Sequence, residues 1–239
     1  MKNKVNILGV SITNETKEKI LEYLMNRIKS PHDKTFIITP NPEMLVYAKN
    51  DLAYQDKLNS ANVALPDGIG LIAAGRLLGK PFKQRITGVD FINDLCEMSR
   101  EKPLSIGFLG GRDGVAELAA HRLKLRYPWI TVVFVAEEWS SEGFVDKKSR
   151  DIDLLFVAYG VPKQEEWIFD NLKKLPIKAA MGVGGSFDFL SGKIQRAPKF
   201  MRAVGLEWLF RLIIQPWRWK RQLALITFLR LVLQQKSSR

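Results

Sequence analysis

The sequence predicts an α/β fold in which helices flank a largely parallel sheet, followed by a helical C-terminal appendage. Up to about residue 190, short apolar runs rich in Val, Ile and Phe alternate with amphipathic segments. Gly, Pro, Asn or Asp residues end nearly every run. Such alternation is typical of βαβ units, whose strands pair in parallel. After residue 198 the strand pattern stops, and the remaining residues follow helical spacing.

The expected elements follow in chain order. Apolar runs predict strands at residues 35–39, 62–65, 104–110, 130–136, 152–160 and 177–184. Amphipathic segments predict helices after four of these runs, at residues 43–50, 69–79, 115–127 and 164–175. No long linker interrupts this pattern, so we expect one α/β domain over residues 1–195 and the appendage over residues 196–239. Pro216 predicts a break between two appendage helices.

Charge is distributed unevenly along the chain. The 239 residues are 46% hydrophobic and 26% charged, as in globular proteins, and the formal net charge is +12. Residues 192–239 hold eleven lysines and arginines and one acid, Glu207, so this segment carries +10 and residues 1–191 only +2. A basic end on a nearly neutral body predicts an anionic partner: nucleic acid, anionic lipid or a phosphorylated ligand.

Cysteine usage and hydropathy indicate where the protein works. Cys96 is the single cysteine, so no intrachain disulfide can form, as expected in a reducing compartment. The N-terminus has too short an apolar run for a signal peptide, and no segment approaches the roughly 18 uncharged apolar residues that span a bilayer. We therefore expect a protein that can lie on a membrane without crossing it.

The carboxyl ends of the expected strands are where we expect a binding site, because ligands of open parallel sheets bind there. The polar and glycine residues at these ends, with those of a polar turn before a helix, are Thr39, Asn41, Asp67, Arg85, Thr87, Asp90, Gly110, Gly111, Tyr159, Gln164, Gly184, Gly185 and Asp188.

Several of these residues also have a purely structural interpretation. Asn41 before Pro42 is typical of a helix N-cap, although capping does not explain Thr39 beside it. Asp67, in LPDGIG, fits either an N-cap or a general base at a strand end. Gln164 is an unusual residue for a first helical turn and can hydrogen-bond a ligand. The residues alone leave these alternatives open.

Two further motifs bear on nucleotide and metal binding. The turn GFLGGRDG fits either a phosphate-binding turn or a tight strand–helix connection, and its spacing differs from the dinucleotide pattern G-x-G-x-x-G. Asp151-Ile152-Asp153 matches a metal-binding D-x-D, but it precedes its strand and so lies at the wrong end of the sheet. The two histidines lack the spacing of a zinc site. We predict neither a metal nor another cofactor.

The basic appendage fits three interpretations: a single-stranded nucleic-acid arm, an interfacial membrane helix, or a helical pair with a solvated basic face. Residues 206–214 follow the helical apolar period, residues 217–221 alternate Trp with Arg and Lys, and residues 223–233 are apolar on much of a helix. So much apolar surface disfavours a nucleic-acid arm. It favours docking on a membrane or on another subunit.

Seven motifs, in this order, resemble those of a known family: TPNPEM, LPDGIG, RITGVDF, GFLGG, VAYGVPKQEEWI, GVGGSFDFLSGKIQRAPKFMRAVGLEWLFRL and QPWRWKR. From about residue 5 to residue 225 the chain is similar to the WecG/TagA/CpsF family of bacterial glycosyltransferases. The resemblance implies a Rossmann-like α/β core whose appendage closes over the active site and touches the membrane. It also implies an inverting, metal-independent hexosyltransferase, peripheral on the cytoplasmic face of the cell membrane.

The reaction implied by the resemblance transfers N-acetylmannosamine, or its uronic acid, from a UDP-sugar to undecaprenyl-diphosphate-linked GlcNAc. The product is an intermediate of teichoic acid or another cell-surface polysaccharide. In this family the position of Asp67 is the proposed catalytic base. The resemblance implies that the substrate pocket includes Thr39, Asn41, Arg85 and Gln164. It implies that diphosphate is held by Arg211, Arg218 and Arg221. The nucleotide site would be lined by Gly110, Gly111, Gly185 and Asp188.

A rival of another class is a non-enzymatic nucleotide- or nucleic-acid-binding module with a basic arm. Strongly salt-dependent oligonucleotide binding without sugar-dependent release of UDP would identify it. A weaker rival is an inactive membrane-surface scaffold, against which an intact Asp67 argues. We expect no nucleic-acid partner. The sequence leaves the oligomeric state open, because relatives can self-associate through the surface that the appendage otherwise covers.

Overall fold

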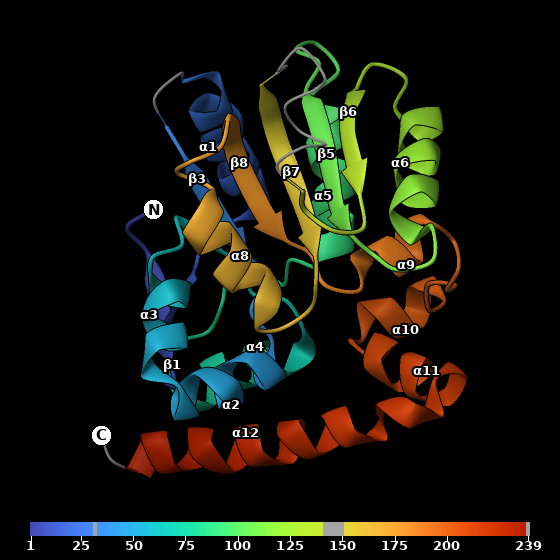
Figure 1. Ribbon diagram of the computed structural model, residues 1–239. Coiled ribbons are helices and arrows are strands. Elements are labelled where there is room, and N and C mark those ends of the chain that lie inside the picture. The colour runs from blue at the N-terminus through green and yellow to red at the C-terminus, as the bar shows by residue number, and fades with distance from the viewer. Residues whose placement is uncertain (31–32, 141–150, 238–239) are drawn as a thin grey trace.

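Six parallel strands form the central sheet (Figure 1). In the computed structural model, which describes residues 1–30, 33–140 and 151–237, they lie in the order β4-β3-β8-β7-β5-β6. The strands are β3 Thr35–Ile38, β4 Val63–Ala64, β5 Ser105–Gly110, β6 Thr131–Ala136, β7 Ile152–Ala158 and β8 Ile177–Gly182. Each neighbouring pair is parallel. The predicted α/β, Rossmann-like fold is confirmed, and so is each of the six predicted strands.

Two strands end two residues earlier than predicted. β7 stops at Ala158 and β8 at Gly182, whereas the apolar runs continue to residues 160 and 184. Gly160 and Gly184 have φ values of 77° and 49°, a left-handed backbone that ends an extended strand. Both glycines line a cleft at the carboxyl edge of the sheet.

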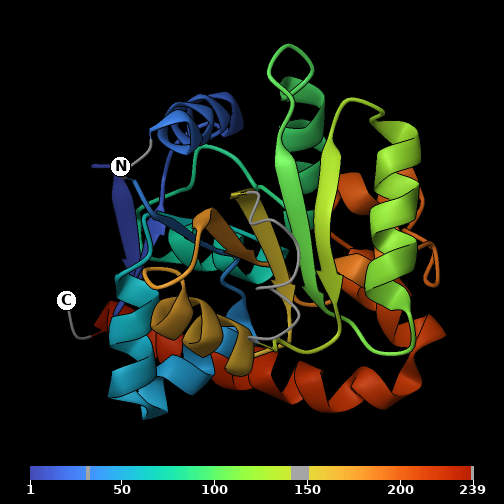
Figure 2. The ribbon, with the colours of Figure 1, turned by 45° about the horizontal axis from the view of Figure 1, so that its top comes forward.

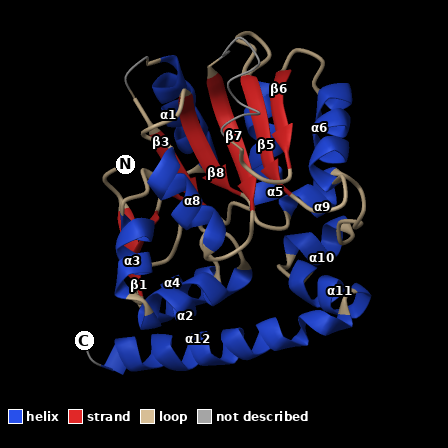
Figure 3. Ribbon diagram, viewed as in Figure 1, coloured by secondary structure: helices blue, strands red, loops and turns tan. Residues whose placement is uncertain are grey.

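Helices cover both faces of the sheet (Figure 3). The helices of the described residues are α1 Lys17–Lys29, α2 Pro42–Asn50, α3 Leu52–Asn59, α4 Ile69–Leu77, α5 Gly88–Met98, α6 Val115–Arg126, α8 Lys163–Asn171, α9 Ser186–Leu190, α10 Lys199–Ala203, α11 Glu207–Ile214 and α12 Trp219–Ser237. One hydrophobic layer joins the sheet to α1, α5, α6 and α9, and the other joins it to α2, α3, α4, α8 and α12. Alternating strand residues enter the two layers: Ile37 faces the first, whereas Phe36 and Ile38 face the second.

An N-terminal hairpin, which the sequence pattern did not predict, joins the second layer. β1 Lys4–Ile7 pairs antiparallel with β2 Val10–Thr13, and the two turn residues between them have φ values of 51° and 88°. Positive φ at both positions suits the twist of a two-residue hairpin. Thr13 Oγ1 accepts a hydrogen bond from the Ala64 N–H at 3.1 Å, which attaches the hairpin beside β4.

The appendage passes beneath the carboxyl edge of the sheet (Figures 1 and 2). A 3₁₀ turn, Pro216–Arg218, separates α11 from α12, which confirms the break predicted at Pro216. α12 then runs back across the molecule and packs on α2 and α4. Its Phe228 and Val232 are fully buried, and Gln235 accepts a hydrogen bond from the Leu8 N–H at 3.0 Å. The C-terminal helix therefore completes the second hydrophobic layer, in which it contacts helices from the first half of the chain.

Candidate active site

A cleft of about 350 Å³ opens between the strand ends and the appendage. The turns after β4, β3, β8 and β7, which are neighbours in the sheet, form one wall. Glu207, Trp208 and Arg211 of the appendage contribute to the opposite wall. The cleft brings together nine of the predicted site residues: Thr39, Asn41, Asp67, Arg85, Thr87, Gln164, Gly184, Gly185 and Arg211.

Asp67 follows β4 and lies on the cleft wall. Gly68, with a φ of 88°, occupies the N-cap position of α4, and that helix begins without a side-chain cap. The capping interpretation of Asp67 is therefore wrong. Its carboxylate accepts a hydrogen bond from the N–H of Gly88, the first residue of α5, at 3.3 Å.

The surroundings of Asp67 favour its protonated form. Burial raises the pKa of Asp67 from the ordinary value of 3.8 to about 6. The hydrogen bond from Gly88 and the positive charge of Arg85 lower this pKa, whereas the negative charges of Glu207 and Asp90 raise it. A carboxyl group with a pKa near 6 is ionised at neutral pH and is a stronger base than a surface aspartate. These properties suit a general base.

Thr39 and Asn41 shape the turn after β3. Asn41 Oδ1 accepts a hydrogen bond from the Met44 N–H at 3.0 Å and caps α2, with Pro42 as the first helical residue. Thr39 Oγ1 donates to the Gly182 carbonyl at 2.9 Å and so ties the end of β3 to the end of β8. The capping interpretation of Asn41 is confirmed. Both side chains also line the cleft, where they remain candidates for substrate contact.

Gln164 and Glu165, at the start of α8, belong to a buried hydrogen-bond network behind the cleft. Gln164 Oε1 accepts from the N–H groups of Gly160 and Gly184, at 3.2 and 3.0 Å. Gln164 Nε2 donates to one Glu165 oxygen at 2.5 Å, and the Tyr54 hydroxyl donates to the other at 2.9 Å. Burial raises the pKa of Glu165 to about 7, although both hydrogen bonds lower it. One amide thus holds together the turns that follow β7 and β8.

Among the arginines that line the cleft, Arg85 reaches it from the core and Arg211 from the appendage. Arg85, which precedes α5, donates to the main-chain carbonyl of Arg202 at 2.6 Å. Arg211, on α11, stacks over the Phe189 ring at 4.5 Å from its centroid and pairs with Asp188 at 3.4 Å. Held guanidinium groups of this kind suit an anionic ligand such as a diphosphate, because they bind its oxygens in pairs.

Predicted nucleotide-site residues lie at the edge of this cleft or beyond it. Gly185 lies against Arg211, since an added Cβ would come within 3.3 Å of its guanidinium nitrogens. Gly110 ends β5 and Gly111 follows it, and neither is among the described residues that line the cleft. A Cβ on Gly110 would meet the Ala158 backbone at 2.8 Å, so close strand packing accounts for that glycine.

A family model described as the glycosyl transferase WecG/TagA/CpsF family matches residues 5–239. This chain belongs to that family. Three relatives are each named N-acetylglucosaminyldiphosphoundecaprenol N-acetyl-beta-D-mannosaminyltransferase. The one from Bacillus subtilis (strain 168) is 31% identical over 236 residues, covering 98% of this chain and 92% of the relative. The one from Bacillus spizizenii is 36% identical over 208 residues (83% and 79%), and the one from Staphylococcus aureus (strain MRSA252) is 32% identical over 228 residues (91% and 86%).

Membership of the WecG/TagA/CpsF family confirms the resemblance seen in the motifs, and the fold shows why those motifs lie far apart in the chain. TPNPEM follows β3, LPDGIG follows β4, GVPKQEEWI follows β7 and GVGGSFD begins at the last residue of β8. Because these strands are neighbours and parallel, their carboxyl ends meet at one cleft. The side chains of Arg218 and Arg221 lie outside the described part of the structure.

Three further residues belong to the site that the sequence patterns did not single out: Glu165, Arg196 and Glu207. Arg196 forms ion pairs with Glu207 and with Asp90, and it lines the cleft. Arg196 lies in the family motif that contains QRAP, and this could have marked it as a site residue. The motif does not show which carboxylates Arg196 contacts. Contacts between distant residues produce no periodic pattern in the sequence.

The discounted D-x-D motif lies away from the cleft, as predicted. Asp153, at the amino end of β7, pairs with Lys178 at 2.8 Å and accepts a hydrogen bond from the Ser105 N–H at 2.9 Å. The described residues contain no group of three or more His, Cys, Asp or Glu side chains that could hold a metal ion. Among the same residues, none of the helices has the length and apolar character needed to cross a bilayer.

Proposed function

We propose that this protein transfers N-acetylmannosamine, or its uronic acid, from a UDP-sugar to undecaprenyl-diphosphate-linked GlcNAc. The observation that carries the proposal is a part-buried carboxylate of raised pKa, Asp67, in a cleft that also holds Arg85 and Arg211. Family membership supports a glycosyltransferase, and the names of three relatives support N-acetylmannosamine as the sugar and the lipid-linked GlcNAc as the acceptor. The product would feed teichoic acid or another cell-surface polysaccharide.

In the proposed reaction Asp67 accepts the proton of an acceptor hydroxyl. The acceptor oxygen attacks the anomeric carbon of the donor from the face opposite UDP, and the bond from that carbon to the UDP oxygen breaks. This single displacement inverts the anomeric configuration and needs one base. The raised pKa of Asp67, about 6, matches base catalysis near neutral pH.

The departing UDP carries the negative charge that develops in this step. Arg211 and Arg85 are placed to offset it, and we assign Arg218 and Arg221 to the same diphosphate. Arg211 is pre-set for this task by its stacking on Phe189 and its contact with Asp188. Gly110, Gly111, Gly185 and Asp188 are our candidates for the nucleotide site. We propose that the positive charges of these arginines, and not a metal ion, offset the charge of the departing UDP.

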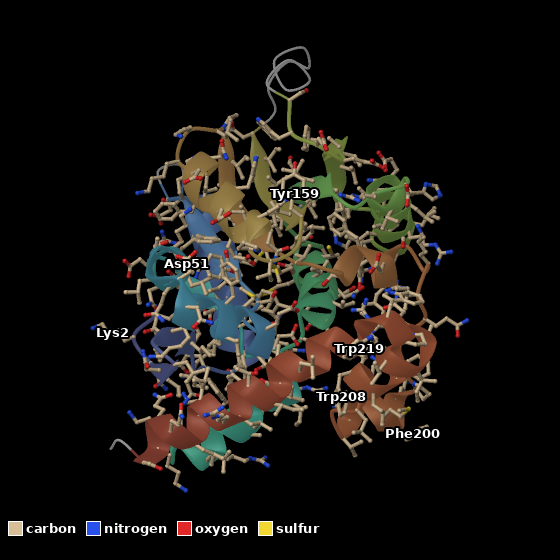
Figure 4. The ribbon with its side chains drawn as sticks, turned by 60° about the horizontal axis from the view of Figure 1, so that its bottom comes forward. Lys2, Asp51, Tyr159, Phe200, Trp208 and Trp219 are labelled. Atoms are coloured by element: carbon tan, nitrogen blue, oxygen red, sulfur yellow. The ribbon has the colours of Figure 1, made fainter. Side chains whose placement is uncertain are left out.

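The acceptor is a membrane lipid, so the protein must reach a membrane surface. The appendage exposes apolar side chains at Phe200, Val204, Ile213, Ile214, Trp217, Trp219, Leu223 and Ile226. Figure 4 shows Phe200, Trp208 and Trp219 on the appendage elements at the underside of the molecule. Exposed tryptophans beside a basic segment suit a headgroup region with anionic lipid. We propose peripheral binding to the cytoplasmic face of the membrane.

The decisive experiment measures UDP release from UDP-N-acetylmannosamine and a soluble lipid-diphosphate-GlcNAc analogue, with EDTA present. Release that needs both substrates and is lost in Asp67→Ala supports the proposal. UDP-N-acetylmannosaminuronic acid in a parallel reaction identifies the donor. No release from either donor, with salt-dependent oligonucleotide binding instead, would contradict the proposal and favour a nucleic-acid-binding module.

A further inference from the structure

Arg196 joins the appendage to the core beside the cleft. Its Nε donates to Glu207, the first residue of α11, at 2.5 Å. Its terminal nitrogens donate to the two oxygens of Asp90, on the first turn of α5, at 3.0 and 3.4 Å. A single guanidinium therefore bridges two carboxylates that belong to different parts of the fold.

Hydrogen bonds continue from this bridge to the proposed base. Thr87, the N-cap of α5, donates its hydroxyl to Asp90 at 2.6 Å. The next residue, Gly88, donates its N–H to Asp67 at 3.3 Å. Arg196 holds Asp90, Asp90 accepts a hydrogen bond from Thr87, and Thr87 precedes Gly88. The position of Arg196 therefore affects the Gly88 N–H, which holds Asp67.

The bridge also sets how α11 approaches the cleft. Glu207 and Arg211 lie four positions apart on α11, so they occupy one face of the helix. Since Arg196 holds Glu207, it fixes the position from which Arg211 reaches the cleft. Arg85 provides a second link to the appendage through the Arg202 carbonyl.

Arg196 lies in the wall between two hollows in the surface. It lines the cleft of about 350 Å³ and also a polar groove of about 590 Å³, and Arg85, Thr87, Val89 and Phe189 line both hollows as well. Loss of the Arg196 side chain should open part of this shared wall and admit water nearer to Asp67. Burial is the largest cause of the raised pKa of Asp67, so added water would change its titration.

We propose that Arg196 is a positioning residue that couples the docking of α11 to the placement of Asp67 as the catalytic base. The proposal rests on the transferase function proposed above. Arg196 acts through Asp67 and Arg211 and need not touch substrate. Arginine suits this role because its planar group can bind two carboxylates at once, which the single ammonium of lysine cannot reproduce.

The charged groups around Asp67 decide the direction of the expected change. Arg85 lies before α5, Asp90 on α5 and Glu207 on α11, and Arg196 lies in the cleft wall between them. Displacing α11 removes Glu207 and part of the burial, both of which raise the pKa of Asp67. Asp90 continues to raise it, but burial is the largest cause. The pKa of Asp67 should therefore fall.

The experiment compares the unaltered protein with Arg196→Gln, Arg196→Lys and the double variant Arg196→Gln/Glu207→Gln. Carboxyl ¹³C NMR follows the Asp67 titration, with Asp67→Asn for assignment, and amide hydrogen exchange follows α11. In Arg196→Gln we expect the Asp67 midpoint to move from about 6 toward 3.8. We also expect faster exchange along α11 and a kcat lower by about 10- to 100-fold. Arg196→Lys should be intermediate, and the double variant should lose no more than Arg196→Gln alone.

Lys193→Gln is the matched control, because Lys193 lies in the same loop, is half-exposed and is 3.9 Å from Asp113. It should leave all three readouts unchanged. An unchanged Asp67 midpoint with unchanged α11 exchange in Arg196→Gln would overturn the proposal, and so would additive losses in the double variant. If the unaltered protein transfers no sugar, the transferase function fails, while the NMR and exchange readouts still decide the coupling.

Discussion

At the scale of the residue, two carboxyl groups with raised pKa values have different roles in the site. Burial is the largest cause of the raised pKa of both Asp67 and Glu165. Asp67 lines the cleft, where a substrate hydroxyl can reach it. Glu165 instead accepts hydrogen bonds from Tyr54 and Gln164 behind the cleft. Because of these positions, Asp67 suits proton transfer, whereas Glu165 suits holding a turn in place.

Asp67→Asn should lower kcat by about 10²- to 10⁴-fold, because the amide cannot accept the acceptor's proton. For the unaltered protein, kcat/KM should rise with pH through about 6, the pKa of Asp67, as the base ionises. A pH series of kcat/KM measures both effects. Asp170→Asn, a change at an exposed residue on α8, is the control and should keep full activity. Full activity of the Asp67→Asn variant would show that Asp67 is not the catalytic base.

The same substitution should stabilise the folded protein above pH 6. The pKa of Asp67 is about 6 when folded and 3.8 ordinarily, so the folded state holds a proton that the unfolded chain releases. Stability contributed by that proton is present below pH 3.8 and is lost as pH rises through 6. Asp67→Asn carries no such charge, so at pH 7.5 its free energy of unfolding should be higher by up to about 3 kcal/mol. Denaturant titration at pH 4 and pH 7.5 measures the difference, and a variant less stable at pH 7.5 would contradict it.

Glu165→Gln should reduce the pH dependence of the stability between about pH 4.5 and pH 7, a higher pH range than that of Asp67. The pKa of Glu165 rises from 4.5 to about 7 on folding, so its stabilising proton is lost as pH rises through 7. A glutamine keeps the shape, can still accept a hydrogen bond from Gln164, and stays neutral. The variant's Tm should match that of the unaltered protein near pH 4.5 and exceed it at pH 8. A parallel pH dependence in both proteins would show that Glu165 is not the titrating group.

At the scale of the element, α12 owes its place to a few buried side chains. Its apolar residues lie on most of its circumference, and several, such as Ile226, remain exposed. Phe228 and Val232 are the ones that enter the hydrophobic layer of α2 and α4. Gln235 adds a hydrogen bond to the turn of the N-terminal hairpin. The helix is therefore anchored at its C-terminal half.

Phe228→Ala should destabilise the protein by about 3 to 5 kcal/mol, because it leaves a cavity in a packed layer. Chemical denaturation measures the loss. Ile226→Ala is the matched control on the same helix, since its side chain is 67% exposed, and it should change stability by less than about 0.5 kcal/mol. Equal losses in the two variants would show that α12 does not dock in the way described.

At the scale of the whole molecule, the appendage places an apolar, basic surface beside the cleft that would receive a lipid-linked sugar. Residues 192–239 carry +10 of the total charge of +12. The exposed apolar side chains of α10, α11 and α12 lie on the same segment. Charge and apolar area together favour a membrane with anionic lipid.

Trp217→Ser with Trp219→Ser should weaken binding to vesicles that contain anionic phospholipid by about tenfold or more. Both side chains are exposed, at 69% and 54%, so the fold should be unaffected. Vesicle sedimentation measures binding, and turnover of a soluble acceptor analogue should be retained. Leu125→Ser, an exposed apolar residue on α6, is the control. Unchanged vesicle binding in the tryptophan variant would place the membrane contact elsewhere.

The sequence by itself determined the six strands, the break at Pro216, the family and the strand-end residues of the cleft. Strand and helix periodicity and turn chemistry depend on near neighbours, so they can be recognised along the chain. The rule that parallel strands bind ligands at their carboxyl ends then selected Thr39, Asn41, Asp67 and Gln164 without any coordinates. The N-terminal hairpin escaped prediction because its turn, Leu8-Gly9, is not one of the dipeptides typical of two-residue hairpins.

Only the tertiary structure decided how those residues are held. Tyr54 and Glu165 are 111 positions apart, and Arg196 and Asp90 are 106 apart. It also showed that Asp67 does not cap α4, the helix that follows it, and that α12 packs on α2. Contacts of this kind depend on which strands become neighbours and where helices cross. Those choices are made by burial and hydrogen bonding over the whole chain, so no local pattern of residues encodes them.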